Sequence, residues 1–315
     1  MIDVVALGEL LIDFAAKSTD AAGYPTMAAN PGGAPGNFLA ALNAYGRKTA
    51  FLGKVGNDAF GRLLLGTLNA AGIVTKGIVV DDSVFTTLAF VTFDESGDRS
   101  FSFARKPGAD TQLSWEEINK SLIDEARVFH FGTLSLTDEP VHTATQKAVA
   151  YAKEHGKLIT CDPNLRLPLW HNEEAAKEQM LWSLHQADVV KISDNEVEFL
   201  WNCTPEAGAE KLLTEFGVGL AMVTLGPDGC LLKTKNASFR ATCPKVHPVD
   251  TTGAGDIFGG SAVSRLLELE KPIDALTEAD LAYIGCFAAT AASLSTEASG
   301  GIPSIPEKEA VLNAM

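Results

Sequence analysis

Residues 250–260 read Asp-Thr-Thr-Gly-Ala-Gly-Asp-Ile-Phe-Gly-Gly, and an apolar pattern typical of a helix follows them. The small residues Gly253, Ala254 and Gly255 allow a ligand to approach the backbone closely. At the start of a helix their N–H groups stabilise negative charge. The stretch therefore predicts an anion hole, with Asp256 at its edge as the base for a hydroxyl that attacks a phosphoryl group. The alternative is that Asp256 is an acidic helix-start residue favoured by the helix dipole alone.

Two other phosphate-binding patterns do not fit this stretch. A dinucleotide fingerprint needs a third glycine, but position 258 is Phe258, and the stretch lies far from the first βαβ unit. The sequence also lacks the Gly-x-x-x-x-Gly-Lys-Ser/Thr pattern of a P-loop. The phosphate site is therefore expected to be of a different type.

Short apolar runs alternate with helical patterns along the rest of the chain. The clearest runs are residues 4–7, 158–161, 189–192 and 221–225. This alternation is typical of βαβ units around a buried, mainly parallel sheet, so we predict an α/β fold. Polar residues follow several of the runs: Glu9 and Asp13, residues 162–164, and residues 193–195. Because ligands bind beyond the carboxyl ends of the strands in open α/β sheets, we expect the site in these loops.

Residues 86–103 break this pattern. Apolar and polar residues alternate with a period of two on both sides of residues 94–98, which predicts a β-hairpin. A hairpin inserted among βαβ units does not simply extend a parallel sheet. We therefore expect a small separate sheet that pairs it with residues 14–28 and acts as a lid. The alternative is an antiparallel edge on the main sheet.

The chain resembles the PfkB, or ribokinase-like, family of carbohydrate kinases from end to end. Residues 250–260 are similar to the C-terminal signature of that family, and residues 32–37 with 53–61 are similar to its glycine-rich N-terminal signature. The resemblance implies one domain over residues 1–315, a Rossmann-like three-layer sandwich with a mainly parallel central sheet and the β-sheet lid described above. It also implies an ATP-dependent kinase that uses Mg²⁺ and takes a sugar as its second small-molecule partner.

Several positions of these motifs correspond to sugar-binding residues of the family. The resemblance implies that Asp13, Gly33 and Asn37 contact sugar hydroxyls, with Gly32 beside them and Asp256 as the base. Without the resemblance, Asp13 is equally compatible with a turn at a strand end and Asn37 with a helix start.

Further segments resemble the nucleotide site of the family. Asn195 and Glu198 match its Asn-x-x-Glu motif, which implies that Asn195 lies near the triphosphate and Glu198 near Mg²⁺ through water. An acidic pair on a solvated helix would have the same spacing. Residues 224–229 are similar to the nucleotide loop, although an ordinary turn fits them as well. The implied nucleotide contacts are Lys191, Asn195, Thr224, Gly226, Gly229, Gly253 and Gly255.

Residues 162–170 resemble the loop of fructokinases and of the similar 2-keto-3-deoxygluconate kinases. Arg166 in this loop, and Arg105 after the predicted hairpin, would donate to sugar oxygens or stabilise transition-state charge. For Arg166, a structural bond to backbone carbonyls is an equal alternative. Ala104 stands where a typical fructokinase has tyrosine. We therefore predict fructose as the acceptor, with another sugar such as 2-keto-3-deoxygluconate as the enzymatic alternative. A sugar-binding regulator without turnover is the other alternative, and the retained Asp256 favours catalysis.

Residues 295–304 read Ser-Thr-Glu-Ala-Ser-Gly-Gly-Ile-Pro-Ser. In potassium-activated members of the family, a similar loop lies beside the Asp-Thr-Thr segment and carbonyl oxygens from both surround the ion. The resemblance implies a K⁺ site built from Asp250, Thr252, Ser295, Ala298 and Gly300, with Ser304 adding an oxygen. A Gly/Ser-rich surface turn without an ion is the alternative.

The composition restricts the partners. The 315 residues carry a formal net charge of −15, which disfavours nucleic acids and anionic membranes. No run approaches the roughly 20 apolar residues that a membrane span requires. Five widely spaced cysteines and an N-terminus unlike a signal peptide predict reduced thiols and a cytoplasmic protein. Apolar lid strands would suit a homodimer formed through the lid.

Overall fold

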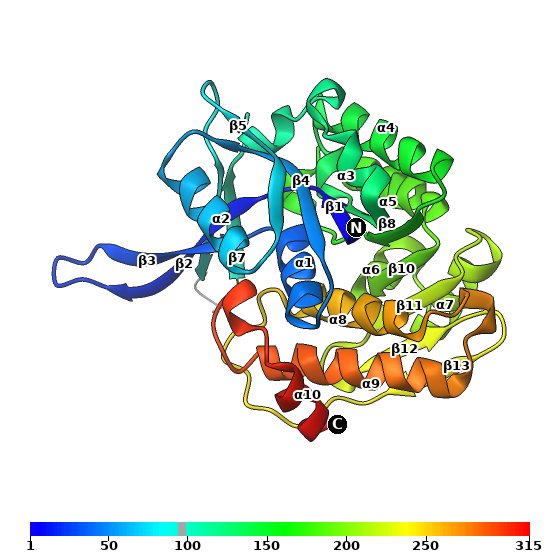
Figure 1. Cartoon of the computed structure of the whole chain (residues 1–315). Helices are drawn as coiled ribbons and strands as arrows, with labels where there is room; N and C mark the ends of the chain where they lie inside the picture. The colour runs from blue at the N-terminus through cyan, green and yellow to red at the C-terminus, as the bar shows by residue number, and fades with distance from the viewer. Residues whose placement is uncertain (94–98) are drawn as a thin grey trace.

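The computed structural model describes residues 1–93 and 99–315, and two β-sheets organise this part of the chain (Figure 1). In the described residues the larger sheet has nine strands in the order β13-β12-β11-β10-β9-β8-β1-β4-β5. These are β1 (Ile2–Leu7), β4 (Thr49–Gly56), β5 (Val74–Asp81), β8 (Ala126–Gly132), β9 (Leu158–Asp162), β10 (Val189–Ser193), β11 (Leu220–Thr224), β12 (Cys230–Lys233) and β13 (Ser238–Ala241). The pairs of β12 are antiparallel and the other pairs are parallel, which confirms the predicted α/β fold.

Helices cover both faces of this sheet, so the molecule has three layers (Figure 1). One face packs against α3 (Lys120–Glu125), α4 (Val141–Glu154), α5 (Glu173–Gln186), α6 (Asp194–Trp201) and α7 (Pro205–Thr214). The other packs against α1 (Ala34–Ala44), α2 (Ala59–Ala70), α8 (Ala254–Leu269) and α9 (Glu278–Ser295), and α10 (Lys308–Ala314) packs on this helix layer. Short 3₁₀ segments occur at Ala109–Gln112, Trp115–Glu117, Leu134–Leu136, Leu167–Leu169, Gly226–Asp228, Ile273–Ala275 and Ile302–Ser304.

Strand β1 shows why its sequence is apolar without interruption. Val5 and Leu7 point into the core beneath α3 to α7, whereas Val4 and Ala6 point into the core beneath α1 and α2. Successive side chains of a strand face opposite sides of the sheet, and here both sides are buried. A continuous apolar run is therefore the pattern that this position in the fold requires.

The smaller sheet has the order β3-β2-β6-β7 and consists of β2 (Leu11–Thr19), β3 (Pro25–Gly32), β6 (Thr87–Phe93) and β7 (Arg99–Ala104). Strands β6 and β7 pair antiparallel, and β6 pairs parallel with β2. The prediction of a separate sheet is confirmed and the alternative of an edge on the main sheet is wrong. Residues 94–98, the predicted turn, lie outside the described residues.

The first lid segment differs in detail from the prediction. The segment of about residues 14–28 that was expected to join the small sheet belongs to a longer hairpin of two strands, β2 and β3, that spans residues 11–32. In Figure 1 this hairpin projects from the body of the molecule. Within the described residues no helix is both long and apolar enough to cross a membrane, and the five cysteines form no disulfide.

Candidate active site

A cleft of about 620 Å³ is lined by residues of the small sheet and by residues from the carboxyl edge of the large sheet. The parallel register explains why polar residues meet there, since Ser193 pairs with Thr224 and Gly132 pairs with Asp162 at the strand ends. Many predicted site residues line the cleft: Asp13, Gly33, Asn37, Arg166, Lys191, Asn195, Thr224, Gly226, Asp250, Thr252, Gly253, Gly255, Asp256 and Gly300. Others do not line it: Gly32, Arg105, Glu198, Gly229, Ala254, Ser295, Ala298 and Ser304.

The predicted anion hole is the first turn of α8. Gly253 precedes the helix with φ +78°, in the left-handed region that favours glycine, and a Cβ there would lie 2.9 Å from the Cα of Gly301. Glycine therefore brings the helix start close to the loop at residue 301. The N–H groups of the first turn have no partner within the helix. Ala254 N–H donates to the Thr251 carbonyl at 3.3 Å, whereas Gly253 and Gly255 line the cleft, where their N–H groups are available to an anion.

Asp256 lies in that first turn and faces the cleft. The Nδ2 group of Asn37, on α1, donates to Oδ2 of Asp256 at 2.9 Å. Burial raises the pKa of Asp256 above its ordinary value, while Asn37, Lys191 and Arg166 act to lower it. This hydrogen bond connects the N-terminal signature, which contains Asn37, to the C-terminal signature, which contains Asp256, although 219 positions of the chain separate the two residues. A carboxylate with a raised pKa beside an anion hole is the arrangement that a general base requires.

The predicted sugar contacts lie in the same cleft, on β2, β3 and the start of α1. Asp13 on β2 is in register with Asn30 on β3, and both line the cleft. Burial raises the pKa of Asp13 to about 6, although Arg166 acts to lower it. A side chain at Gly32 would collide with the Asp13 carboxylate, and a Cβ at Gly33, where φ is +112°, would lie 2.5 Å from the Glu9 carbonyl oxygen. The two glycines therefore leave room for carboxylate, amide and backbone groups to face a ligand.

The predicted nucleotide residues lie at the ends of β10 and β11. Thr224 and Gly226 line the cleft with Asn195, which lies in the first turn of α6. Glu198 is exposed one turn further along the same helix. In the described residues no three acidic, histidine or cysteine side chains cluster as a metal site. This arrangement is compatible with an Mg²⁺ ion held mainly through water and phosphate, as Mg²⁺ prefers. Gly229, at φ +96°, instead packs tightly against the Ala241 carbonyl of β13.

The two loops of the predicted K⁺ site lie side by side. The Thr296 carbonyl accepts hydrogen bonds from the N–H groups of Val249 and Asp250, and Gly300 N–H donates to Oδ2 of Asp250 at 3.1 Å. The other carboxylate oxygen of Asp250 accepts from Thr252. These bonds fix the relative position of the two loops, so a cation between them would act on the start of α8.

Arg105 departs from the sequence-based expectation. It was expected to contact sugar, but its side chain is buried and each nitrogen has an internal partner. Nε donates to Asp110 at 2.8 Å, Nη1 to Thr137 at 2.8 Å and Nη2 to the Leu134 carbonyl at 2.8 Å. A guanidinium with its donors satisfied inside the protein has little capacity left for a ligand. We therefore assign Arg105 to the support of the lid base instead of the sugar site.

Several polar residues that line the cleft were not among the predicted site residues, among them Glu9, Asn30, Asn164, Ser193, Asp194, Glu196 and Thr251, and Asp162 lines a small adjoining cavity. Glu9 accepts from Ala34 N–H at the start of α1, and burial raises its pKa to about 7. Asp162, at the end of β9, has a pKa that burial likewise raises to about 7. Asn164, which also lines the cleft, has φ +51°. Their position directly after strands was the available signal, since it marked the loops, but no pattern distinguished these side chains from turn residues.

The fold and the cleft define a class of protein, a phosphotransferase of the ribokinase type. The model of the pfkB family of carbohydrate kinases matches residues 1–308, and the chain belongs to this family. It is therefore a carbohydrate kinase. Fructokinase-2 from Solanum lycopersicum is 39% identical over 323 residues, which cover 99% of this chain and 95% of the relative.

Solved structures agree with this placement. A fructokinase from Xylella fastidiosa with bound ATP has a TM-score of 0.91 and 29% identity, covering 100% of this chain and 98% of its own. A fructokinase from Vibrio cholerae O395 that holds fructose, ADP and potassium has a TM-score of 0.87 and 30% identity, covering 99% and 98%. A putative ribokinase II from E. coli, with ATP and Mg²⁺, has a TM-score of 0.86 and 28% identity, covering 99% and 98%.

Proposed function

We propose that the protein is a fructokinase that converts fructose and ATP into fructose 6-phosphate and ADP. The observation that carries this proposal is the Asp256 carboxylate at the first turn of α8, facing a cleft that Asp13 also lines. Relatives named fructokinase across nearly the whole chain support the choice of sugar. We treat residues 1–315 as one functional domain, in which β2, β3, β6 and β7 form a lid over the sugar.

Each group of cleft residues has a role in this reaction. Asp256 accepts the proton of the attacking sugar hydroxyl, and the hydroxyl oxygen forms a bond to the γ-phosphorus of ATP. The bond between that phosphorus and the β–γ bridging oxygen breaks, and ADP leaves with the electron pair. The N–H groups of Gly253, Ala254 and Gly255 stabilise the charge on the transferring group. Asp13, Asn37 and the backbone at Gly33 hold the sugar, while Lys191, Asn195, Thr224 and Gly226 contact the nucleotide.

When bound, Mg²⁺ would neutralise charge on the β- and γ-phosphates. Asn195 and Glu198 would orient its water ligands from α6. The two residues are three positions apart on one helix, so their side chains share a face.

A second substrate, the sugar acid 2-keto-3-deoxygluconate, is favoured by one observation. The Arg166 guanidinium lines the cleft and is close enough to Asp13 and Asp256 to act on the pKa of both. An arginine in this position is suited to a substrate carboxylate.

The test is ADP formation with fructose, ribose, adenosine and 2-keto-3-deoxygluconate, each at several concentrations. We expect the highest kcat/KM with fructose. The highest value with the sugar acid would replace the fructokinase proposal by the second candidate. Sugar binding without ADP formation would identify a sugar-binding regulator.

The Asp13→Asn variant is expected to lose sugar affinity and to gain stability. A hydrogen bond to a charged group contributes about 1.5–3 kcal/mol, so kcat/KM for sugar should fall about 10- to 100-fold. Because the folded protein raises the pKa of Asp13 to about 6, the charged form destabilises the fold, and stability is lost as the pH rises through about 6. Removing the charge should recover up to about 3 kcal/mol at pH 8. Urea denaturation at pH 5 and pH 8 would test this, and an equal effect at both values would contradict it.

Potassium is expected to raise kcat at constant ionic strength, with sodium and tetramethylammonium less effective. The reason is that an ion between the loops of Asp250 and Gly300 would fix the start of α8 and so orient the anion hole. The expected oxygen ligands come from Asp250, Thr252, Ser295, Ala298, Gly300 and Ser304. Rates measured at saturating ATP and Mg²⁺ that are the same in all three salts would exclude a selective activating site.

We also propose that two copies associate through the lid. Strand β3 is at the edge of the small sheet in the described residues, and its backbone groups on the outer side are available for pairing. Analytical ultracentrifugation would show a concentration-dependent dimer, and deletion of residues 20–24 at the hairpin tip would leave the dimer intact if the strand edge, and not the tip, forms the contact.

A further inference from the structure

A buried ion pair lies beneath the anion hole. Lys191 on β10 is 8% exposed, Asp162 on the neighbouring strand β9 is 7% exposed, and Nζ lies 2.9 Å from Oδ2. Lys191 and Asp256 line both the cleft and a small cavity of about 20 Å³, and Asp162 lines the small cavity. The pair is therefore close to the Asp256 carboxylate of the proposed function.

The ammonium group of Lys191 lies directly under the first turn of α8. A Cβ placed on Gly255 would be 3.0 Å from Nζ, so glycine at this position lets the ammonium approach the helix start. An ammonium has three donors, and the hydrogen bond to Asp162 uses one of them. The cation therefore shares the cleft wall with the backbone N–H groups that would bind the transferring phosphoryl group.

Stability alone does not explain this pair. The loss of hydration of two buried charges commonly outweighs their attraction, and apolar replacements of similar volume are often neutral or stabilising. Burial by itself lowers the pKa of Lys191, but Asp162, Glu196 and Asp256 raise it above its ordinary value, so the side chain stays charged. Burial raises the pKa of Asp162, and Lys191 opposes that rise. The fold thus maintains a charged lysine at a position where an apolar side chain would be less costly.

We propose that Asp162 is a positioning residue that holds the Lys191 ammonium beside Gly255, where Lys191 contacts the transferring phosphoryl group. This inference rests on the proposed function and adds a cation to the anion hole. During transfer, the Lys191 ammonium and the N–H groups at the start of α8 would together stabilise the negative charge on the phosphoryl oxygens. A preorganised donor of this kind needs no rearrangement as the charge develops.

The charges that act on Asp256 come from several elements. They are Lys191 on β10, Asp162 on β9, Glu196 on α6, Asp13 on β2 and Arg166 in the loop after β9. Lys191 and Arg166 favour the anionic form of Asp256, whereas the carboxylates oppose it. Removal of Lys191 should therefore raise the pH at which Asp256 is deprotonated.

The experiment compares the wild type with Lys191→Met, Asp162→Asn and the double variant. We expect kcat to fall about 10²- to 10³-fold in Lys191→Met, the loss typical for one donor of an anion hole. In Asp162→Asn a roughly tenfold loss is expected, with the KM for sugar nearly unchanged. Because Asp162 acts through Lys191, the Asp162→Asn change should cost less than about threefold when Lys191 is already absent. Two structural defects would instead multiply.

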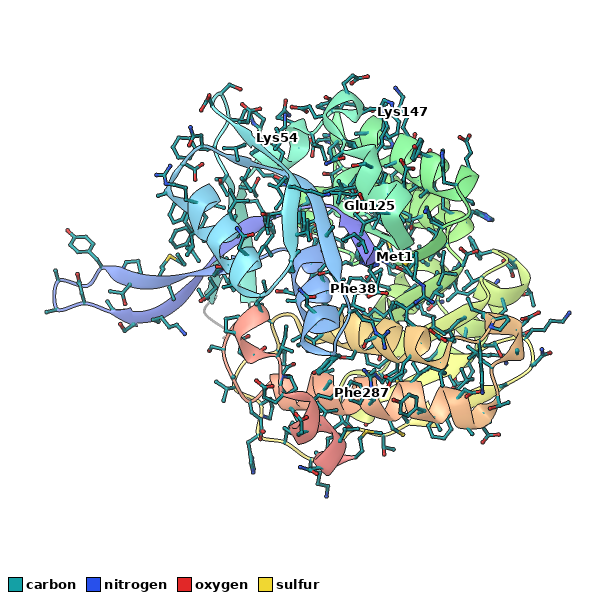
Figure 2. The ribbon with its side chains drawn as sticks, in the orientation of Figure 1. Met1, Phe38, Lys54, Glu125, Lys147 and Phe287 are labelled. Atoms are coloured by element: carbon teal, nitrogen blue, oxygen red, sulfur yellow. The ribbon has the colours of Figure 1, made fainter. Side chains whose placement is uncertain are left out.

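The pH profile of kcat/KM separates positioning from general damage. The acid limb should move to higher pH in Lys191→Met, because the cation that favours the anionic form of Asp256 is lost. A matched control is Lys54→Met, which removes another buried lysine of the large sheet (Figure 2). Lys54 is 3% exposed, and its partners are Asp81 and Glu117. Lys54 does not line the cleft, so this variant should lose stability without moving the acid limb.

Multiplicative losses in the cycle, or an acid limb of Lys191→Met that coincides with that of the wild type, would overturn the proposal. The double variant removes both charges together, so it guards against a fold weakened by one unpaired charge. The dissociation constant of ATP, measured by calorimetry in the same four proteins, provides a readout that needs no turnover. The effect of Asp162→Asn on this constant should also be small when Lys191 is already absent. Absence of turnover by the wild type with every sugar would contradict the proposed function, whereas turnover with additive ATP-binding effects would contradict only the role of Asp162.

Discussion

Replacing Asp256 by asparagine should lower kcat by about 10²–10⁴ while leaving the dissociation constant for sugar within a few-fold of the wild-type value. Asparagine preserves the size of the side chain, but it cannot accept the proton of the sugar hydroxyl. Asn37 can still pair with the new amide oxygen, so the local structure should persist. Steady-state ADP formation and equilibrium sugar binding would be measured on the same preparation. A kcat close to that of the wild type would contradict the assignment of Asp256 as the base.

The matched control is Asp280→Asn, which changes an aspartate in the first turn of α9. Hydrogen bonds from Lys271 and the Thr277 cap lower the pKa of Asp280 to about 2, whereas burial raises the pKa of Asp256. The two aspartates occupy similar positions in the first turn of their helices, but their pKa values are shifted in opposite directions. If Asp256 were only a helix-start residue, the two variants would lose similar stability and neither would lose turnover. We expect Asp280→Asn to lose stability and Asp256→Asn to lose turnover.

The pH dependence follows from the same setting. Because the base must be deprotonated and its pKa is raised, kcat/KM should increase with pH through a value above the ordinary range of aspartate. The acid limb should be absent in Asp256→Asn, whose residual rate has no carboxylate to titrate. An unchanged acid limb in this variant would assign the titration to another group.

Much of the fold could be predicted because local sequence patterns and burial agree. Val4 to Leu7 is apolar without interruption because both faces of β1 are covered, and the alternation in residues 86–103 marked strands with two different faces. The anion hole could be predicted because glycine at 253 and 255 has a backbone reason, the close approach of Gly301 and of Lys191. At such positions the geometry requires glycine, so the requirement can be recognised in the sequence.

The remaining site could not be predicted because its partners are distant in the chain. Nothing local to Asp162 shows that Lys191, 29 positions later, lies 2.9 Å away. Glu9 likewise becomes part of the site only because α1 begins above it, where Ala34 N–H donates to its carboxylate. A polar residue after a strand gives the same sequence pattern whether it faces a ligand, caps a helix or pairs with a buried charge.

Arg105 shows the same limit, and its replacement by alanine should separate a structural from a ligand-binding role. The variant leaves Asp110, which is 3% exposed, without its cation and removes donors from Thr137 and the Leu134 carbonyl. Breaking a buried ion pair by removing one partner costs about 3–5 kcal/mol. We therefore expect a large loss of stability in urea denaturation, with the KM for sugar little changed in the protein that remains folded.

Arg166→Ala is the matched comparison, because Arg166 is exposed, lines the cleft and donates only to the adjacent Leu165 carbonyl in the described structure. Its loss should leave the free energy of unfolding within about 0.5 kcal/mol of the wild type, as is usual for surface substitutions. The KM for sugar should rise instead, since the guanidinium faces the ligand. Arg105→Ala would then lower stability and Arg166→Ala would raise the KM for sugar, because the donors of Arg105 point into the protein and those of Arg166 point out of it. A raised KM with unchanged stability in Arg105→Ala would reverse this assignment and return Arg105 to the sugar site.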